Sequence, residues 1–170
     1  MFVLTTKQFG DATRWANSLS DHGFIARCDE LFVEQRRPFL EMLSFAQEGA
    51  ADHEFKAMIN YLSILQKLAK DHFPAAAVPI EQDEFAEAVK RSCDFFYSIE
   101  SDDLSDHKRL VEAWIGTTMQ HGEEVVWTGC IMTIQEGNIM ASPFYSGMVP
   151  TIYAVADCYS RRLMACELQG

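Results

Sequence analysis

Apolar residues recur at α-helical spacing along most of the chain, and the clearest case runs from Asp52 to His72. Its apolar side chains form one continuous face opposite lysines and an asparagine, which is typical of a helix packed against a core. A second stripe over residues 6–21 predicts a helix that Gly23 ends.

A third stripe runs from Asp29 to Gln47 and contains Pro38. Proline has no amide hydrogen and disfavours helical geometry in the residue before it, so a break or kink is expected there. Gly49 is expected to end this helix. Its short separation from the helix at 52–72 predicts an antiparallel helical hairpin.

Two further helices are predicted beyond the proline-bounded loop at 74–79. The first begins at 81–84, where carboxylates favour a helix N-terminus, and continues to Ile99. The second follows the polar loop at 100–106 and ends at Gly122.

The segment Val125–Ile134 is ambiguous, because it is rich in β-branched residues but lacks the alternation of a half-buried strand. A helix ending at Gly137 is the preferred interpretation, since the elements around it are helical. The alternative is a β-hairpin that pairs this segment with Ile139–Tyr145 through a turn at Gln135–Asn138.

The last helix is predicted to start at Pro150, with Asp157 and Arg161 placed to form an ion pair one turn apart. It belongs to Val111–Ser160, a segment without lysine or arginine. A solvated segment of this length normally carries both charge signs, so most of it is expected to be buried, Trp114 included. An apolar segment of this kind is also compatible with a homodimer interface.

Together these elements predict an all-α fold in which residues 1–170 form a single-domain bundle of six or seven helices. The alternative is an α+β fold with a small β-hairpin around 125–145. A chain of 170 residues suits one domain with a sizeable core. The uncharged run at 137–156 is interrupted by prolines and a glycine, so no membrane-spanning helix is expected.

The five cysteines are odd in number, widely spaced and without a Cys-x-x-Cys pair. This pattern indicates free thiols in a reducing compartment rather than a disulfide framework or a zinc knuckle. The first residues place apolar side chains before the only nearby cation, which is the reverse of a secretory signal. We therefore expect a cytoplasmic protein.

Catalytic signatures are missing from the sequence. Four of the five histidines follow an aspartate, but adjacent helical residues point about 100° apart and form neither a ligand set nor an oriented pair. Glu-x-x-His, His-Glu-x-x-His, Gly-x-Ser-x-Gly and glycine-rich phosphate loops do not occur. No metal, no cofactor and no catalytic residue is predicted, and a non-enzyme is favoured.

Charge is the strongest functional signal. The net charge of −11 disfavours binding to a nucleic-acid backbone. Residues 81–106 hold nine acidic residues against Lys90 and Arg91, and so carry −7 of this −11. Such a run either steers a basic partner or serves solubility. The residues that we expect to contact a basic protein partner are Glu81, Asp83, Glu84, Glu87, Glu100, Asp102, Asp103 and Asp106.

The sequence therefore predicts a non-catalytic protein that binds a basic partner, as an inhibitor, an immunity protein or an adaptor does. The alternative is a small helical enzyme or ligand-binding domain that uses histidines and an aromatic, methionine-rich pocket in the C-terminal region. The residues of this alternative pocket are Trp114, His121, Trp127 and Tyr145.

Overall fold

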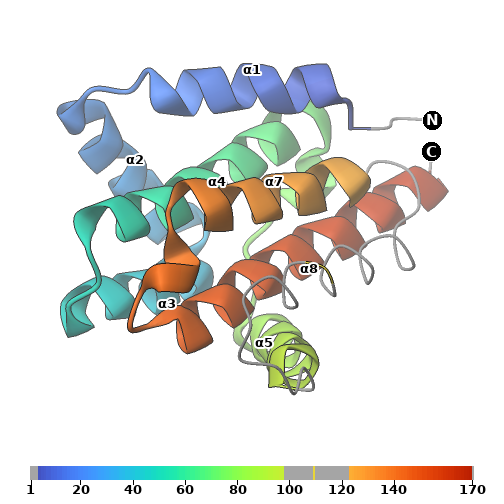
Figure 1. Ribbon diagram of the computed structural model, residues 1–170. Helices are drawn as coiled ribbons and strands as arrows, with labels where there is room; N and C mark the ends of the chain where they lie inside the picture. The colour runs from blue at the N-terminus through green and yellow to red at the C-terminus, as the bar shows by residue number, and fades with distance from the viewer. Residues whose placement is uncertain (1–3, 98–108, 110–122, 170) are drawn as a thin grey trace.

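The computed structural model describes residues 4–97, 109 and 123–169, which form an all-α domain (Figure 1). The described residues contain no strand, so the all-α prediction is confirmed and the β-hairpin alternative around 125–145 is wrong. Seven α-helices and two short 3₁₀ turns make up the described ranges: α1 (Thr6–Asn17), α2 (Asp21–Glu34), α3 (Arg36–Glu48), α4 (Asp52–His72), η1 (Pro74–Ala76), α5 (Gln82–Tyr97), α7 (Glu123–Glu136), η2 (Ile139–Ala141) and α8 (Tyr145–Gln169).

Helix α4 is central to the packing and lies against α1, α3, α7 and α8. Figure 1 shows α1 at the top of the molecule, α4 and α7 beneath it, and α8 below them. The predicted helix at 52–72 is confirmed to the residue. Gly49 ends α3 in the left-handed conformation, with φ of 114°, as its position predicted.

Helix α7 forms because its apolar residues repeat at helical spacing, which outweighs the β preference of its valines and isoleucines. Val126, Cys130 and Ile134 are buried and lie four residues apart along one side. Gly137 follows the last helical residue, and a Cβ atom there would lie 2.7 Å from the Cβ of Ala57. Glycine at this position therefore allows α7 to pack closely on α4.

The predicted boundary at Gly23 is wrong, because this glycine lies inside α2 rather than after α1. The Ser20 hydroxyl accepts a hydrogen bond from the Gly23 amide at 3.1 Å and caps the new helix. Helix α2 therefore starts at Asp21, eight residues before the predicted Asp29.

The break expected at Pro38 occurs three residues earlier, at Gln35, which separates α2 from α3. Pro38 lies in the first turn of α3, where an amide hydrogen has no partner within the helix, so proline is tolerated there.

Helix α8 starts at Tyr145 and not at Pro150, which lies inside it. The Ser142 hydroxyl accepts a hydrogen bond from the Phe144 amide at 3.1 Å and sets the earlier start. The predicted pair one turn apart is confirmed, since Arg161 Nε lies 3.0 Å from Asp157 Oδ1.

The C-terminal part of the cation-free segment is buried, as its composition predicted: every residue from 148 to 156 is buried. Exposed large apolar side chains are most numerous on α2, where Ile25, Phe32 and Val33 face solvent, although Met132 of the cation-free segment is exposed as well. The homodimer stays a prediction, but α2 offers more exposed apolar surface for it than α8 does. The predicted helix ending at Gly122, and Trp114 within it, lie outside the described residues.

No helix in the described ranges combines the length and the apolar character that crossing a bilayer requires.

Candidate functional site

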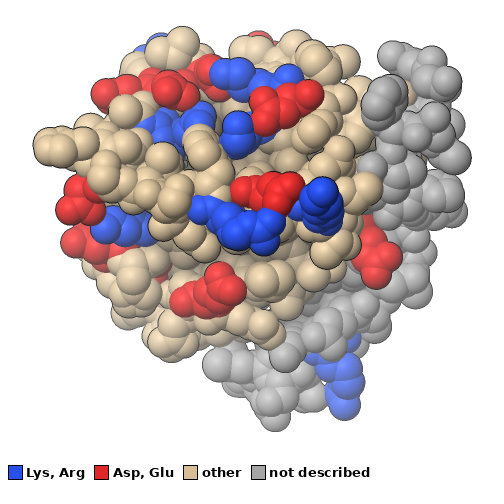
Figure 2. All heavy atoms as spheres, turned by 90° about the horizontal axis from the view of Figure 1, so that it is seen from above, with Lys and Arg blue, Asp and Glu red and all other residues tan. Residues whose placement is uncertain are grey.

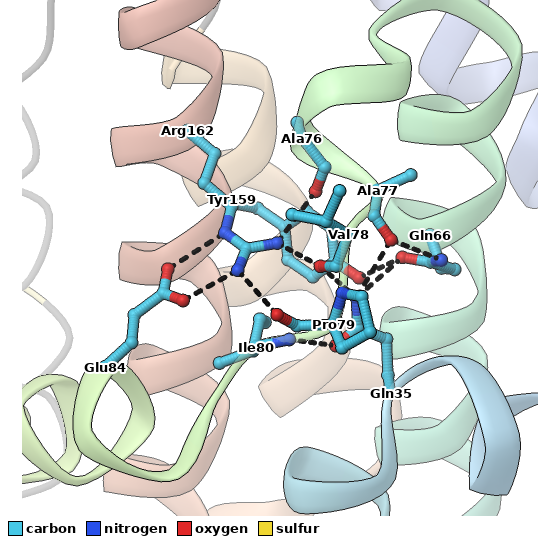
Figure 3. A network of polar contacts seen from close by, with 10 residues as sticks. All are labelled: Gln35, Gln66, Ala76, Ala77, Val78, Pro79, Ile80, Glu84, Tyr159 and Arg162. Carbon is cyan, nitrogen blue, oxygen red and sulfur yellow. Dashed lines mark hydrogen bonds and ion pairs between the residues drawn. The ribbon is translucent and has the colours of Figure 1, made fainter.

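The most extensive polar cluster centres on Gln35, the fully buried residue between α2 and α3 (Figure 3). Its Nε2 donates to Gln66 Oε1 at 3.0 Å and to the Val78 carbonyl at 3.0 Å. Its Oε1 accepts from the Ile80 amide at 2.9 Å. One side chain thus joins the α2–α3 junction, α4 and the segment that leads into α5.

Gln66 and Tyr159 extend this cluster toward α8. The Tyr159 hydroxyl donates to Gln66 Oε1 at 2.7 Å, and Gln66 Nε2 donates to the Ala77 carbonyl at 3.0 Å. Burial raises the pKa of the Tyr159 hydroxyl well above its ordinary range, which keeps it neutral and a donor. These contacts satisfy polar groups that would otherwise be costly inside the core.

Arg162 and Glu84 form the outer part of the same cluster. Arg162 Nε lies 2.8 Å from Glu84 Oε1 and Nη2 lies 2.6 Å from Oε2, a bidentate pair. The guanidinium also donates to the carbonyls of Ala76 at 3.2 Å, Pro79 at 3.0 Å and Val78. Because these groups bind one another, the cluster holds the segment between α4 and α5 in place rather than presenting a reactive side chain.

The acidic residues predicted to contact a partner fall into three groups. Glu81, Asp83 and Glu87 are exposed, whereas Glu84 is engaged by Arg162. The remaining residues lie outside the described residues: Glu100, Asp102, Asp103 and Asp106.

The solvent side of α5 gathers the exposed carboxylates into the α5 acidic face, defined here as Asp83, Glu87 and Asp94. Their helical spacing places them on the side opposite the buried residues of α5. Lys90 shares this side, and Arg91 is turned to Asp157, with Nη2 to Oδ2 at 2.6 Å.

A groove lies between α3 and α5, the helix that also bears the α5 acidic face. It has a volume of about 380 Å³ and an apolar floor to which both helices contribute, with Arg37 and Glu41 as its charged residues. Gln82 and Ala86 line the groove, whereas Asp83 and Glu87, the next residues in sequence, point about 100° further round the helix. The residues of this α3–α5 groove are Arg37, Leu40, Glu41, Gln82, Phe85, Ala86 and Val89.

The structure describes two of the four residues of the predicted aromatic pocket, Trp127 and Tyr145. Trp127 is buried against Tyr153, with ring centroids 6.1 Å apart, and belongs to the core between α7 and α8. The ring of Tyr145 instead packs edge-on against the ring of Phe96 in α5, with the ring centroids 6.1 Å apart. The other two residues of that prediction, Trp114 and His121, lie outside the described residues.

In one of the aspartate–histidine dipeptides, Asp71–His72, the two side chains have separate partners. Asp71 pairs with Lys67 at 3.0 Å, while the neighbouring His72 ring lies 3.4 Å from the amide of Gln8. Within the described ranges, no three His, Cys, Asp or Glu side chains gather in a way that could hold a metal ion. The absence of a metal stays a prediction.

All five thiols are free, and the buried ones are poorly suited to nucleophilic chemistry. Burial, followed by the carboxylates of Glu84 and Asp157, raises the pKa of the Cys158 thiol from 9.0 to about 12. Burial also raises the pKa of the Cys130 thiol well above its usual range. Neither sulfur is a thiolate at neutral pH, and the thiolate is the reactive form.

This shift predicts an alkaline loss of stability. The unfolded chain releases the Cys158 proton near pH 9 and the folded chain near pH 12, so the stabilisation is complete below pH 9 and disappears as pH rises to 12. Urea unfolding at about pH 8 and about pH 10.5 should show a smaller loss in Cys158→Ala than in the wild type. An equal loss in both proteins would show that this thiol does not contribute.

No protein-family model, curated protein or solved structure matches the chain.

Proposed function

We propose that the protein is a non-catalytic, cytoplasmic binding or regulatory protein that holds a basic segment of a partner protein against α5. One observation carries this proposal: α5 bears the exposed acidic face and also forms one wall of the apolar α3–α5 groove. A basic segment with one apolar side chain matches both surfaces. Its cations lie at the carboxylates, and its apolar group lies in the groove. An inhibitor, an immunity protein or an adaptor binds in this way.

The carboxylates of the α5 acidic face are available to such a partner. Glu87 lies 4.0 Å from Arg91, which is itself held more closely by Asp157. Exposed ion pairs with this separation contribute at most about 1 kcal/mol to stability, so a cation of the partner can replace Arg91 beside Glu87. Glu84 belongs to the internal cluster with Arg162 and is left out of the proposed surface.

The face covered by α1 has a different character, which supports placing the partner at α5. Figure 2 shows both charge signs mixed on that face. There the ring of Trp15 has Arg27 at 4.2 Å and Lys67 at 4.9 Å from its centroid, and these cations also pair with Glu30 and Asp71. Charges that are already paired with one another attract an incoming charged protein less.

The free thiols agree with the proposed reducing compartment, because disulfides are rare in the cytosol. The net charge of −11 agrees with a basic protein partner and against nucleic acid. The acidic residues at 100–106 belong to the same proposal, although they lie outside the described residues.

The first test is a pull-down from a native lysate with the wild-type protein and with the double variant Asp83→Lys, Glu87→Lys. We expect the wild type to retain a basic protein and the reversed variant to lose most of it, because two attractive charges become repulsive. Thermal unfolding should confirm that the variant is folded.

The matched control is Asp29→Lys, Glu48→Lys, which changes the net charge equally. Both residues are exposed and lie outside α5 and outside both grooves. The control should retain the partner. Equal retention by all three proteins would show that the α5 acidic face serves solubility only.

A further inference from the structure

A second groove lies between α1, α4 and α7, on the part of the molecule where these three helices run side by side (Figure 1). Its volume is about 260 Å³. The residues that line this α1–α4–α7 groove come from all three helices: Phe9, Thr13 and Asn17 from α1; His53, Lys56, Ala57, Asn60, Tyr61 and Ile64 from α4; and Gly129, Met132, Thr133, Glu136 and Gly137 at or just after α7.

The directions of the helices divide this groove into a polar and an apolar end. Gln8 of α1 lies 3.4 Å from His72 at the end of α4, so α1 runs antiparallel to α4. Gly137 meets Ala57 near the start of α4, so α7 is antiparallel to α4 as well.

The last lining residue of α1, the first of α4 and the last of α7 therefore share one end of the groove. This polar end contains Asn17, His53, Lys56 and Glu136. The opposite, apolar end is formed by Phe9, Ile64 and Gly129.

A glycine of α7 allows the Phe9 ring to pack closely at the apolar end of the groove. A Cβ atom on Gly129 would lie 2.2 Å from the Phe9 Cζ, so the ring rests directly on the α7 backbone. The ring thereby forms part of the wall instead of being displaced outward. An apolar group of a ligand would contact this ring and the side chain of Ile64.

The polar end carries one charge of each sign. Lys56 and Glu136 both line it and both are exposed. The Lys56 ammonium lies 5.8 Å from the Phe24 ring, and among the described residues neither side chain forms an ion pair within 4.0 Å. The two charges therefore remain available to a ligand.

We propose that the α1–α4–α7 groove binds a small zwitterion that carries an ammonium, a carboxylate and one compact apolar group, which is the chemistry of an apolar α-amino acid. Lys56 faces the carboxylate, Glu136 faces the ammonium, and the apolar group lies toward Phe9 and Ile64. Asn17 and Asn60 supply neutral hydrogen-bonding groups beside them.

The volume supports a ligand of this size. A cavity of about 150 Å³ holds a benzene molecule, and sites for drug-sized ligands begin at about 300 Å³. At about 260 Å³ the groove lies between these values, which leaves space for one ring or branched chain with a charged head group.

The probe for this proposal is L-phenylalanine, titrated into ¹⁵N-labelled protein and followed by amide chemical shifts. We expect saturable shifts at Asn17, Lys56 and Thr133, with a Kd of about 1 mM, as the few atoms of so small a ligand allow. Phenethylamine lacks the carboxylate and 3-phenylpropionate lacks the ammonium, and each should bind about tenfold more weakly. L-Alanine, without the ring, should also bind more weakly.

Two variants test the assigned roles. Lys56→Met should weaken L-phenylalanine binding about tenfold and leave phenethylamine unchanged, and Glu136→Gln should do the same while leaving 3-phenylpropionate unchanged. The matched controls Lys90→Met and Glu48→Gln, at exposed positions outside the groove, should bind like the wild type.

The proposal is overturned if L-phenylalanine shifts no groove amide at about 10 mM, ten times the expected Kd. It is equally overturned if the three aromatic probes bind alike, or if both groove variants bind like the wild type. The groove contains no residue of α5, so the outcome is independent of the partner-binding proposal.

Discussion

Replacing Gln35 by leucine should destabilise the fold by about 3 kcal/mol or more, because each buried polar group left unpaired costs about 1–3 kcal/mol. The side chain is fully buried and meets the Ile80 amide, the Val78 carbonyl and Gln66. Leucine is of similar size but offers no partner to any of them. Urea unfolding of wild type and variant gives this difference in the free energy of unfolding directly.

The control is Gln47→Leu, the same substitution at an exposed position near the end of α3, where a change within about 0.5 kcal/mol is expected. A loss below about 1 kcal/mol for Gln35→Leu would mean that water or rearranged side chains satisfy the abandoned groups. The cluster would then not be what fixes the segment between α4 and α5.

Trp127→Ala should cost about 3–5 kcal/mol, the range for removing a large aromatic side chain from a core. Trp127 is 4% exposed and packs on Tyr153, whereas Met132 on the same helix is 42% exposed. Met132→Ala is therefore the control and should change the free energy of unfolding by much less. A small loss for Trp127→Ala would favour the alternative in which this tryptophan lines a ligand pocket. The corresponding expectation for Trp114 lies outside the described residues.

The helical pattern could be predicted from the sequence because local spacing determines it. The stripe at 52–72 and the cap at Gly49 are local features, and both are confirmed. The start of α2 was missed because Gly23 suggests a helix end, whereas the Ser20 cap decides where the next helix begins. A glycine near a serine or threonine cap is a weaker stop signal than its propensity implies.

The polar cluster was not predicted, although one signal pointed to it. Gln35 and Gln66 both occupy positions on apolar helical stripes, and a glutamine buried there needs partners for its amide. Those partners include Tyr159 and backbone groups of the segment before α5, far away in sequence. Only tertiary packing brings these partners together, so local spacing cannot identify them. It also cannot predict the ion pair with Arg162 that removes Glu84 from the predicted partner surface.

The two grooves likewise combine features that are evident from the sequence with features that only tertiary packing creates. The acidic character of α5 is evident from composition, but the apolar groove beside it requires the packing of α3 on α5. Likewise, Lys56 and Glu136 are 80 residues apart in sequence and line one groove only because α4 and α7 pack antiparallel. The aromatic pocket stays a prediction, and its two described residues, Trp127 and Tyr145, pack on Tyr153 and Phe96 respectively.

Association kinetics between this protein and the partner captured on it test the central claim most directly, with the rate constants measured over a range of salt concentrations. If the α5 acidic face steers a basic partner, the association rate falls as salt rises while the dissociation rate changes little. The salt dependence should be reduced in Asp83→Lys, Glu87→Lys and kept in Asp29→Lys, Glu48→Lys. The same salt dependence in all three proteins would contradict the proposal that α5 is the surface that receives the partner.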